Sequence, residues 1–359
     1  VAAWSLVEQG HAVECVHMSN WEDDDGYCDA ATDLQDARAV CDRLGLDLHR
    51  VNFAREYRET VFDDFLNEIR AGRTPNPDVL CNREIKFGLM LRYARRLGAD
   101  RIATGHYARL DRTEGQPILL KGRDANKDQS YFLHAVQTED LTDVLFPLGE
   151  LTKREVRELA LRAGLSVSGK RDSTGICFIG ERPFGDFLGR FIEPTPGPIV
   201  TDKGDVVGEH QGLHLYTLGQ RKGIGVGGMT WADSAPWYVA AKREQENELV
   251  VVQGHEHPLL CSDWIETGPM NWIGPPPLEA RNAANLRCQV KTRYRQTDQP
   301  CTLICEPGGR ARVDFDQPQR AVTPGQYAVF YLADRCLGGA RIARTGRGRM
   351  TGLATAEAG

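Results

Sequence analysis

The sequence lacks the features of a secreted or membrane protein. No apolar run approaches the roughly 20 residues that a membrane-spanning helix needs, and no hydrophobic segment with a small-residue cleavage site stands near Val1. The ten cysteines include no CxxC pair and no Cys/His spacing typical of a zinc site. We therefore expect a cytoplasmic protein without a membrane partner, whose cysteines are reduced and mostly buried.

The sequence also lacks an excess of positive charge. Its formal net charge is -6, so the total charge does not indicate a nucleic-acid partner, and any such partner has to be held by local basic patches. With 359 residues, of which 41% are hydrophobic, the chain is long enough for two or three domains with their own cores.

The chain further lacks a recognisable domain start. Residues 1–7 predict a helix already in progress, which Gly10 would end. A helix without a cap or a preceding strand leads us to expect that the front of a domain is missing before Val1.

Strand-like and helix-like segments alternate regularly after Gly10. Strands are predicted at 11–18, 48–53 and 101–106, and helices at 29–44, at 57–71 and from the loop 73–78 to about Leu97. This alternation predicts an α/β fold with a parallel sheet. Ligands bind at the carboxyl ends of such strands, where Met18 and Gly105 lie.

The second half of the chain has a different character. A capping box at residues 152–155 predicts a helix to about Ala163. A hairpin is predicted at 199–201 and 206–208, and short strands are predicted at 286–294, 301–305, 311–315 and 326–331. Short strands at this spacing indicate a small barrel. We expect an N-terminal catalytic domain at 1–182, a central domain at 183–257, a β-barrel at 258–348 and a disordered tail at 349–359.

One candidate catalytic residue is Cys81. Asn76 is a favourable N-cap and Pro77 suits the first helical position, so Cys81 falls in the first turns of a helix. The helix dipole, with Arg83 and Lys86 nearby, favours the thiolate there. Asp78 shares the same helical face and is a candidate acid or base rather than an activator of the thiol. An ordinary capped helix with a half-buried cysteine is the alternative.

A second candidate is Cys177, which follows Lys170 and Arg171 in a glycine-bounded segment. The neighbouring cations could make this thiol acidic. The residues by themselves favour a core position in a short strand.

Basic residues cluster twice in the predicted β region. The first cluster surrounds Tyr294 and contains no acidic residue, which suits a phosphate backbone with a stacked base. A solvated strand face is the alternative. The two clusters are Arg281, Arg287, Lys291, Arg293 and Arg295, and Arg341, Arg344, Arg347 and Arg349.

Taken together, these segments resemble the bacterial-type tRNA-specific 2-thiouridylases. The resemblance extends in order over nearly the whole chain, and its motifs are specific. The matching segments are 18–21, 72–82, 85–87, 103–107, 126–132, 172–182, 208–212, 291–296 and 323–326. The resemblance implies an N-terminal domain of the adenine nucleotide alpha hydrolase-like (PP-loop) class without its first strand and phosphate loop. A small central domain and a C-terminal β-barrel would follow.

The resemblance also implies a reaction. ATP, with Mg²⁺ whose ligands stay unassigned, would activate C2 of the wobble uridine by adenylation, and a persulfide would deliver the sulfur. Cys177 would carry the sulfur from a donor protein, and Cys81 would be the partner nucleophile in a transient Cys81–Cys177 disulfide. Asn76, Pro77 and Asp78 would contact the target base, and Met18 and Gly105 would line the ATP site. Contacts with tRNA would come from His106, Lys127, Asp128, Gln129, Arg293, Tyr294 and Gln326.

Two other functions remain open at this stage. A truncated protein that binds tRNA without catalysis fits the basic strands, because the family's Ser-Gly-Gly-x-Asp-Ser loop for ATP phosphates is absent from this sequence. A thiol–disulfide oxidoreductase would use Cys81 and Cys177, although the lack of CxxC is against it.

Overall fold

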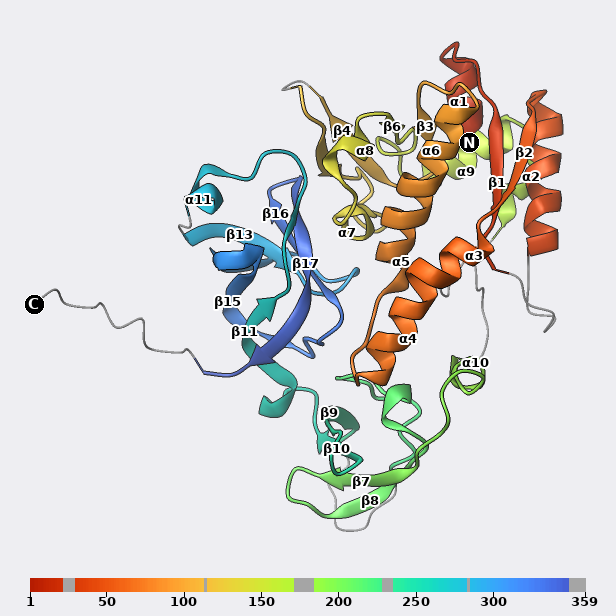
Figure 1. Cartoon of the computed structure of the whole chain (residues 1–359). Helices are drawn as coiled ribbons and strands as arrows, with labels where there is room; N and C mark the ends of the chain where they lie inside the picture. Colours follow the sequence, from red (N-terminus) through yellow and green to blue (C-terminus); the bar gives the residue numbers. More distant parts are fainter. Residues whose placement is uncertain (22–29, 113–114, 171–183, 228–234, 283–284, 349–359) are drawn as a thin grey trace, which may run out of the picture.

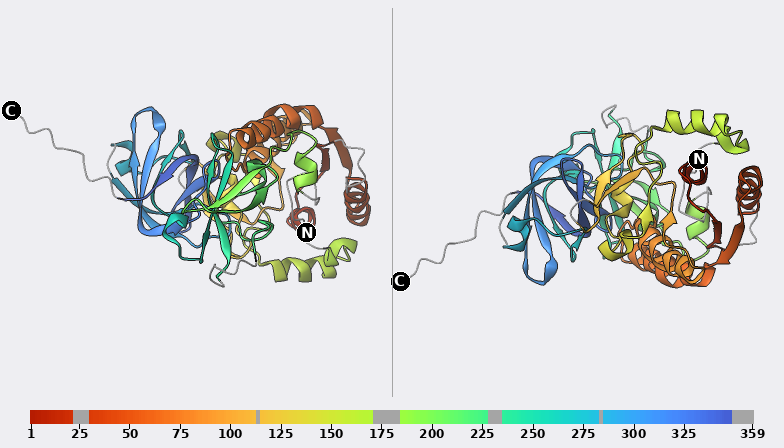
Figure 2. Two further views of the ribbon diagram at one scale, coloured as in Figure 1. Left: turned by 90° about the horizontal axis from the view of Figure 1, so that it is seen from below. Right: turned by 90° about the horizontal axis from the view of Figure 1, so that it is seen from above.

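The chain forms three regions that succeed one another in sequence (Figure 1). The computed structural model describes residues 1–21, 30–112, 115–170, 184–227, 235–282 and 285–348. Cys177 and the expected tail at 349–359 lie outside these residues. Figure 2 shows the barrel at one end of the molecule and the first strands and helices at the other.

The first region is built on short parallel strands. β1 (Cys15–Ser19) pairs with β2 (Leu48–Asn52), and helix α2 (Ala30–Leu44) makes the crossover between them. β3 (Ile102–Ala103) pairs in parallel with β6 (Val144–Leu145). The predicted α/β class with parallel pairing is therefore confirmed, although these strands form two separate pairs and are shorter than expected.

Two long bent helices join these strands. The first consists of α3 (Ala54–Tyr57), η1 (Arg58–Phe62) and α4 (Asp63–Arg70), and the second of α5 (Pro77–Leu80), η2 (Cys81–Leu89) and α6 (Met90–Arg96). The middle segment of each is π-helical. Their buried faces meet in one core cluster that includes Tyr57, Phe62 and Ile85. π-helical turns are rare and are frequently found at functional sites.

A hairpin of the first region reaches the barrel. β4 (Ala108–Asp111) and β5 (Ile118–Lys121) pair with each other, and Leu120 of β5 pairs with Arg335 of the barrel strand β17. The sequence pattern did not predict this link, because a pairing over so long a separation leaves no local signal. The first region and the barrel therefore share one sheet.

The barrel itself is closed and six-stranded. Its order is β11-β15-β14-β13-β16-β17, and β11 pairs with β17 to close the ring. Inward-facing residues such as Ile265, Leu303 and Phe330 fill it. The predicted small barrel is confirmed, but β11 and β17 were not predicted as strands. The strands are β11 (Cys261–Thr267), β13 (Asn285–Lys291), β14 (Gln299–Cys305), β15 (Ala311–Arg320), β16 (Tyr327–Leu332) and β17 (Arg335–Gly346).

The central region is a four-stranded sheet of order β8-β7-β10-β9 with its own core. The predicted hairpin corresponds to β7 (Gly197–Thr201) and β8 (Val206–His210). β9 (Trp237–Arg243) and β10 (Glu248–Gln253) complete the sheet, with β10 parallel to β7.

Short elements fill the remaining connections. Helix α9 (Lys153–Arg162) begins with the predicted capping box, in which Thr152 and Glu155 bond reciprocally. Among the residues described, no helix is both long and apolar enough to cross a membrane. The other elements are α1 (Ala2–Glu8), α7 (Ser130–Leu133), α8 (Thr138–Leu141), η3 (Ser166–Gly169), α10 (Phe184–Leu188), η4 (Leu213–Leu215), η5 (Pro258–Leu260), β12 (Asn271–Trp272), α11 (Leu278–Arg281) and η6 (Pro307–Gly309).

Candidate active site

The start of the second long helix places the candidate nucleophile. Asn76 occupies the N-cap position and Pro77 the first helical position, as predicted, although the Asn76 side chain makes no capping hydrogen bond. Cys81 lies just past the first turn and is fully buried, with a relative exposure of 0%. It belongs to the aromatic cluster that contains Trp21 and Phe62. The thiol is thus more buried than in the alternative interpretation, which was an ordinary capped helix with a half-buried cysteine.

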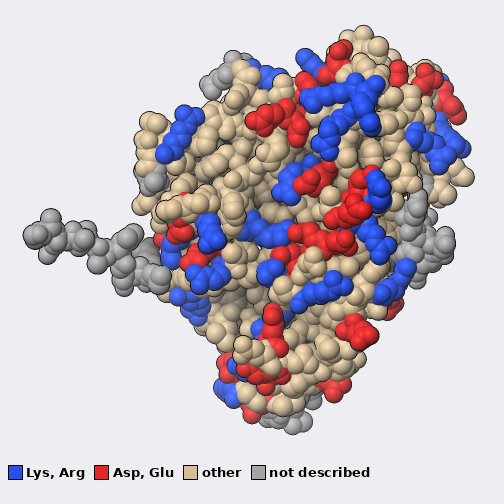
Figure 3. All heavy atoms as spheres, in the orientation of Figure 1, with Lys and Arg blue, Asp and Glu red and all other residues tan. Residues whose placement is uncertain are grey.

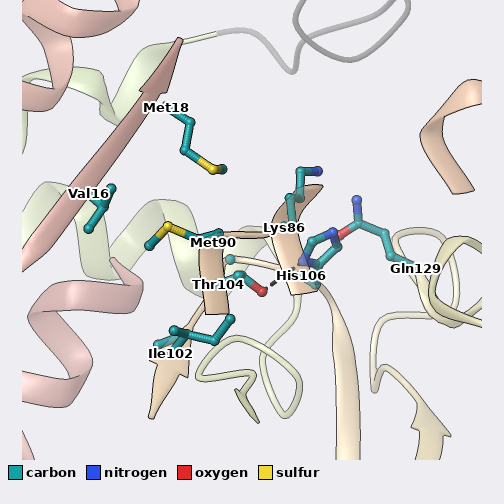
Figure 4. Close-up of a pocket in the computed structure, with 10 residues that line it drawn as sticks. Val16, Met18, Lys86, Met90, Ile102, Thr104, His106 and Gln129 are labelled. Carbon is teal, nitrogen blue, oxygen red and sulfur yellow. Dashed lines mark hydrogen bonds between the residues drawn. The ribbon is translucent and has the colours of Figure 1, made fainter. Parts of the chain in front are cut away.

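A pocket lies beside the same helix, about one turn beyond Cys81. Its volume is about 330 Å³, and it lies between the ends of β1 and β3 and the helix. Met18 and Gly105, predicted for the ATP site, both line it. Val16, Met90 and Ile102 give it an apolar floor, while Lys86, Thr104, His106 and Gln129 add polar groups. Figure 4 shows the ammonium group of Lys86 directed away from that floor.

This lining fits an adenine nucleotide. A flat, largely apolar base suits the methionine and aliphatic side chains, and polar groups at the edge can bind a sugar or a phosphate. The carboxyl ends of parallel strands β1 and β3 border the pocket, where α/β sheets bind ligands.

His106 is a neutral member of this pocket. It is 8% exposed, and its Nδ1 lies 2.8 Å from Oγ1 of Thr104. Burial, together with the positive charge of Lys86, holds the pKa of His106 well below its ordinary value. At neutral pH His106 can therefore donate or accept a hydrogen bond but does not supply a cation.

Gln129 and Asp128 support the pocket from the segment before α7. The side chain of Gln129 accepts a hydrogen bond of 3.0 Å from the backbone N–H of Tyr107. Asp128 is 4% exposed and accepts bonds from the N–H groups of Gly122 and Ser130, at 3.0 and 3.1 Å. The nearby Lys127 is half-buried. A direct contact of these residues with tRNA stays a prediction.

Arg293 and Gln326 make contacts within the protein. Arg293 donates to the carbonyl oxygens of Leu218 and Ala321, at 3.2 and 2.5 Å. Gln326 donates to the carbonyl oxygens of Thr74 and Pro75, at 2.8 and 3.2 Å. Both side chains therefore join separate segments of the chain, whatever their role toward tRNA.

Tyr294 is half-buried, and its ring lies 4.5 Å from that of Phe132. Its neighbour Lys291 is 9% exposed and faces Asp128 at 3.5 Å and Asp298 at 3.7 Å. Tyr294 stays a predicted tRNA contact. Lys291, in contrast, forms internal ion pairs and is not part of a surface patch.

Four of the nine residues in the predicted basic clusters pair with acidic side chains: Arg287, Lys291, Arg341 and Arg344. Arg287 pairs with Asp316 at 2.6 Å, and Arg344 with Glu266 at 2.5 Å. On the face shown in Figure 3, basic and acidic side chains alternate over the surface. Arg295 and Arg347 are exposed, whereas Arg349 lies outside the described residues. The clusters are therefore not one continuous basic face, because acidic partners from distant segments fold against them.

Several site residues had not been assigned from the sequence. Lys86 lines the pocket, and its place one turn after Cys81 was a usable signal. Asn82 is 2% exposed and donates to the carbonyl of Phe132 at 3.3 Å, while its Oδ1 has no partner among the described residues. Asn20, at the end of β1, is 1% exposed, and neither polar atom of its side chain has a partner in the described part of the chain. Neither asparagine lines the pocket, but buried polar groups without a partner are candidates for contact with a bound ligand or water.

No metal ligands can be assigned. Within the described ranges, no three His, Cys, Asp or Glu side chains gather closely enough to hold a metal ion. Mg²⁺, which accompanies ATP in many enzymes, is bound largely through phosphates and water and needs few protein ligands.

Comparison with protein families matches all three regions. Residues 1–181 match a family described as tRNA methyl transferase HUP domain. Residues 185–253 match the tRNA methyl transferase PRC-barrel domain, and residues 262–342 the aminomethyltransferase beta-barrel domain.

Similar proteins match over nearly the full chain. A protein of Chromohalobacter salexigens is 56% identical over 348 residues, which are 96% of this chain and 89% of that protein. A protein of Salmonella typhimurium is 55% identical over 345 residues, 95% of this chain and 93% of the relative. One from Shigella flexneri is 54% identical with the same coverage. All three are named tRNA-specific 2-thiouridylase MnmA.

Proposed function

The chain belongs to the tRNA-specific 2-thiouridylase family, and from this premise we propose that it forms 2-thiouridine at the wobble position of tRNA with ATP and a persulfide. The observation that carries the proposal is the pocket bordered by Met18, Lys86 and Gly105, one turn along the helix from Cys81. An adenine site and a thiol on one helix suit a reaction that activates a base and then delivers sulfur to it.

The pocket residues would bind and orient the nucleotide. The apolar side chains of Met18, Met90 and Ile102 would receive the adenine, and Lys86 would face the phosphates. Bound there, ATP would supply the adenylate that turns the C2 oxygen of the uridine into a leaving group. His106 and Gln129 are both neutral, so they would orient the polar groups of the nucleotide through hydrogen bonds and not through charge.

The helix start would hold the target base and the second thiol. Asn76, Pro77 and Asp78 would contact the uracil, with Asp78 as the acid or base. Terminal persulfide sulfur on Cys177 would attack C2 and displace AMP. The thiolate of Cys81 would then attack Cys177, leaving the sulfur on the base and a Cys81–Cys177 disulfide, which an external thiol must reduce.

The same reaction implies two partner molecules. The tRNA would lie against the barrel and the helix start, and a persulfide-bearing protein would load Cys177. His106, Lys127, Asp128, Gln129, Arg293, Tyr294 and Gln326 are the proposed tRNA contacts.

Thiolation is better supported than methyl transfer or plain redox chemistry. The methyl transferase wording belongs to the domain descriptions, whereas the relatives matched over 95–96% of the chain are named thiouridylases. Burial of Cys81 at 0% exposure also disfavours a general oxidoreductase, whose thiol has to meet many partners.

The test is formation of 2-thiouridine by the purified protein with tRNA, ATP and a persulfide donor. Cys81→Ser and Cys177→Ser are each expected to lower the rate by about 10³-fold or more, since each removes a thiol that forms a covalent intermediate. Cys261→Ser is the matched control, because Cys261 is a partly exposed thiol on barrel strand β11.

If Cys81→Ser formed 2-thiouridine at the wild-type rate, the role proposed for Cys81 would be wrong. Wild-type protein that binds tRNA but makes no product would favour the non-catalytic tRNA-binding alternative.

A further inference from the structure

The segment between the two long helices is held by both of the other regions of the molecule. Residues 72–76 connect α4 to the helix start that carries Cys81. From the barrel, Pro324 accepts a 3.0 Å hydrogen bond from the backbone N–H of Thr74, and Gln326 donates to Thr74 and Pro75. From the central region, Lys242 donates to the carbonyl of Gly72 at 3.2 Å. This segment, which we call the connecting loop, therefore touches all three regions of the molecule.

Glu68 is the centre of a charged cluster at this junction. It lies on α4 and is only 7% exposed. Its carboxylate accepts from Nε and Nη2 of Arg73, at 2.7 and 2.6 Å, in a bidentate pair. Its Oε1 also lies 3.1 Å from Nη1 of Arg341 on barrel strand β17. One carboxylate thus joins the connecting loop to the barrel.

Arg341 completes the cluster. Its Nη2 lies 2.7 Å from Oδ2 of Asp64, one helical turn before Glu68, and 3.3 Å from the hydroxyl of Tyr327. The two arginines and two carboxylates balance in charge. Burial by itself raises the pKa of Glu68, but Arg73 and Arg341 outweigh it and hold the pKa below its ordinary value. Glu68 is therefore ionised at neutral pH and binds both arginines as an anion.

The cluster acts on the proposed site through the connecting loop. Only three residues separate Arg73 from Pro77, where the helix begins, so a shift of Arg73 moves the first turn and Cys81 with it. A bidentate arginine pair has a fixed direction as well as a length. Arg341 lies on β17, which pairs with β16, and β16 begins directly after Gln326. Arg341 and Gln326 therefore reach the first region from two neighbouring barrel strands.

We propose that Glu68 is a positioning residue, which with Arg73 and Arg341 holds the Cys81 helix start in register with the tRNA-binding barrel. The inference rests on the proposed function for its catalytic consequence. Its structural part, the attachment of the connecting loop to the barrel, can be measured without catalysis.

The test replaces Glu68 by Gln, which has nearly the same shape but no charge. We expect faster hydrogen exchange at the N–H of Thr74, because its bond to Pro324 depends on the position of the loop. We also expect the rate of 2-thiouridine formation with saturating tRNA to fall by about 10- to 100-fold, as for a reacting group displaced by about 1 Å. Affinity for tRNA should change by less than about threefold, because phosphate contacts of exposed basic side chains supply most of the affinity and only the base contacts of the helix start would be displaced.

The matched control is Glu266→Gln. Glu266 pairs with Arg344 of the same strand β17, at 2.5 Å, but both residues belong to the barrel. Glu266→Gln should leave hydrogen exchange at the N–H of Thr74 and the rate of 2-thiouridine formation unchanged. Arg341→Lys is the second variant, since an ammonium keeps the charge but cannot bridge Asp64 and Glu68 in the same geometry. It should reproduce the Glu68→Gln effects in a stably folded protein.

Wild-type exchange at Thr74 in both variants, or a wild-type rate, would overturn the proposal. An equal fall in tRNA affinity and rate would also overturn it, because the cluster would then serve binding rather than positioning. If wild-type protein makes no 2-thiouridine, the proposed function fails, while Thr74 exchange still decides whether Glu68 holds the loop.

Discussion

At the scale of single residues, burial decides which titratable groups are charged. His134 is fully buried, with Nδ1 2.6 Å from the carbonyl of Tyr131 and with no partner for Nε2 among the described residues. Burial lowers the pKa of His134 from 6.5 to about 4. It lies where the first region meets the barrel, with its ring 4.8 Å from that of Tyr327.

This histidine predicts a pH dependence of stability. Between pH 6.5 and about 4 the unfolded chain binds a proton at His134 that the folded protein does not, so stability falls as the pH falls through this window. The loss from this one group is about 3 kcal/mol, from a shift of two to three pKa units at 1.36 kcal/mol each. His134→Leu should reduce the fall in unfolding free energy by about that amount, measured by urea denaturation at several pH values. An unchanged pH dependence in the variant would show that His134 is not buried in the neutral form.

At the scale of elements, local signals placed helices well and strand ends poorly. The capping box at Thr152 and Glu155 was visible in the sequence because capping depends on residues three positions apart. The π-helical turns at Arg58–Phe62 and Cys81–Leu89 were not visible. They depend on tertiary packing around the helix, which no residue spacing encodes.

The cap also gives a stability prediction. Thr152→Ala removes the side-chain acceptor for the N–H of Glu155 and the hydroxyl donor to the Glu155 carboxylate, while the backbone N–H of residue 152 keeps its bond to that carboxylate. The substitution should lower the unfolding free energy by about 1 kcal/mol. Thermal unfolding measures the change. Thr142→Ala is a control at a threonine that comes after the short helix α8 and caps no helix start. Equal stability of the Thr152 variant and the wild type would mean that the cap contributes nothing in the folded protein.

At the scale of the whole molecule, the barrel and the first region act as one body. They share a sheet through β5 and β17, and they meet again at the connecting loop and the Glu68 cluster. Arg281, Arg295 and Arg347 of the two predicted basic clusters are exposed. Arg295 is one of them, whereas Arg293, in the same turn, is turned inward to two carbonyl oxygens.

These two arginines should therefore behave differently. Arg295→Gln should weaken tRNA binding and reduce its salt dependence by about one phosphate contact, without loss of stability. Arg293→Gln should lower the thermal stability as well, because it leaves the carbonyls of Leu218 and Ala321 without their donor. Filter binding at several salt concentrations, with melting curves, distinguishes them. Equal effects of both variants on binding and stability would contradict the difference in their surroundings.

The sequence by itself determined the α/β class, the barrel, the helix start at Asn76 and Pro77 and the order of the motifs. Each of these depends on hydrophobic periodicity or on residues a few positions apart, so neighbouring residues carry the information. Met18 and Gly105 were also predicted to meet at one ligand site, because the ends of parallel strands face the same edge.

Only the tertiary structure decided which side chains are exposed and which are paired across the molecule. It buried Cys81, turned Arg293 and Lys291 inward and brought Arg341 to Glu68 across more than two hundred and seventy residues. The physical reason is that burial and ion pairing depend on segments that are distant in sequence. A cluster of arginines in the sequence therefore cannot show whether acidic residues elsewhere in the chain already bind it.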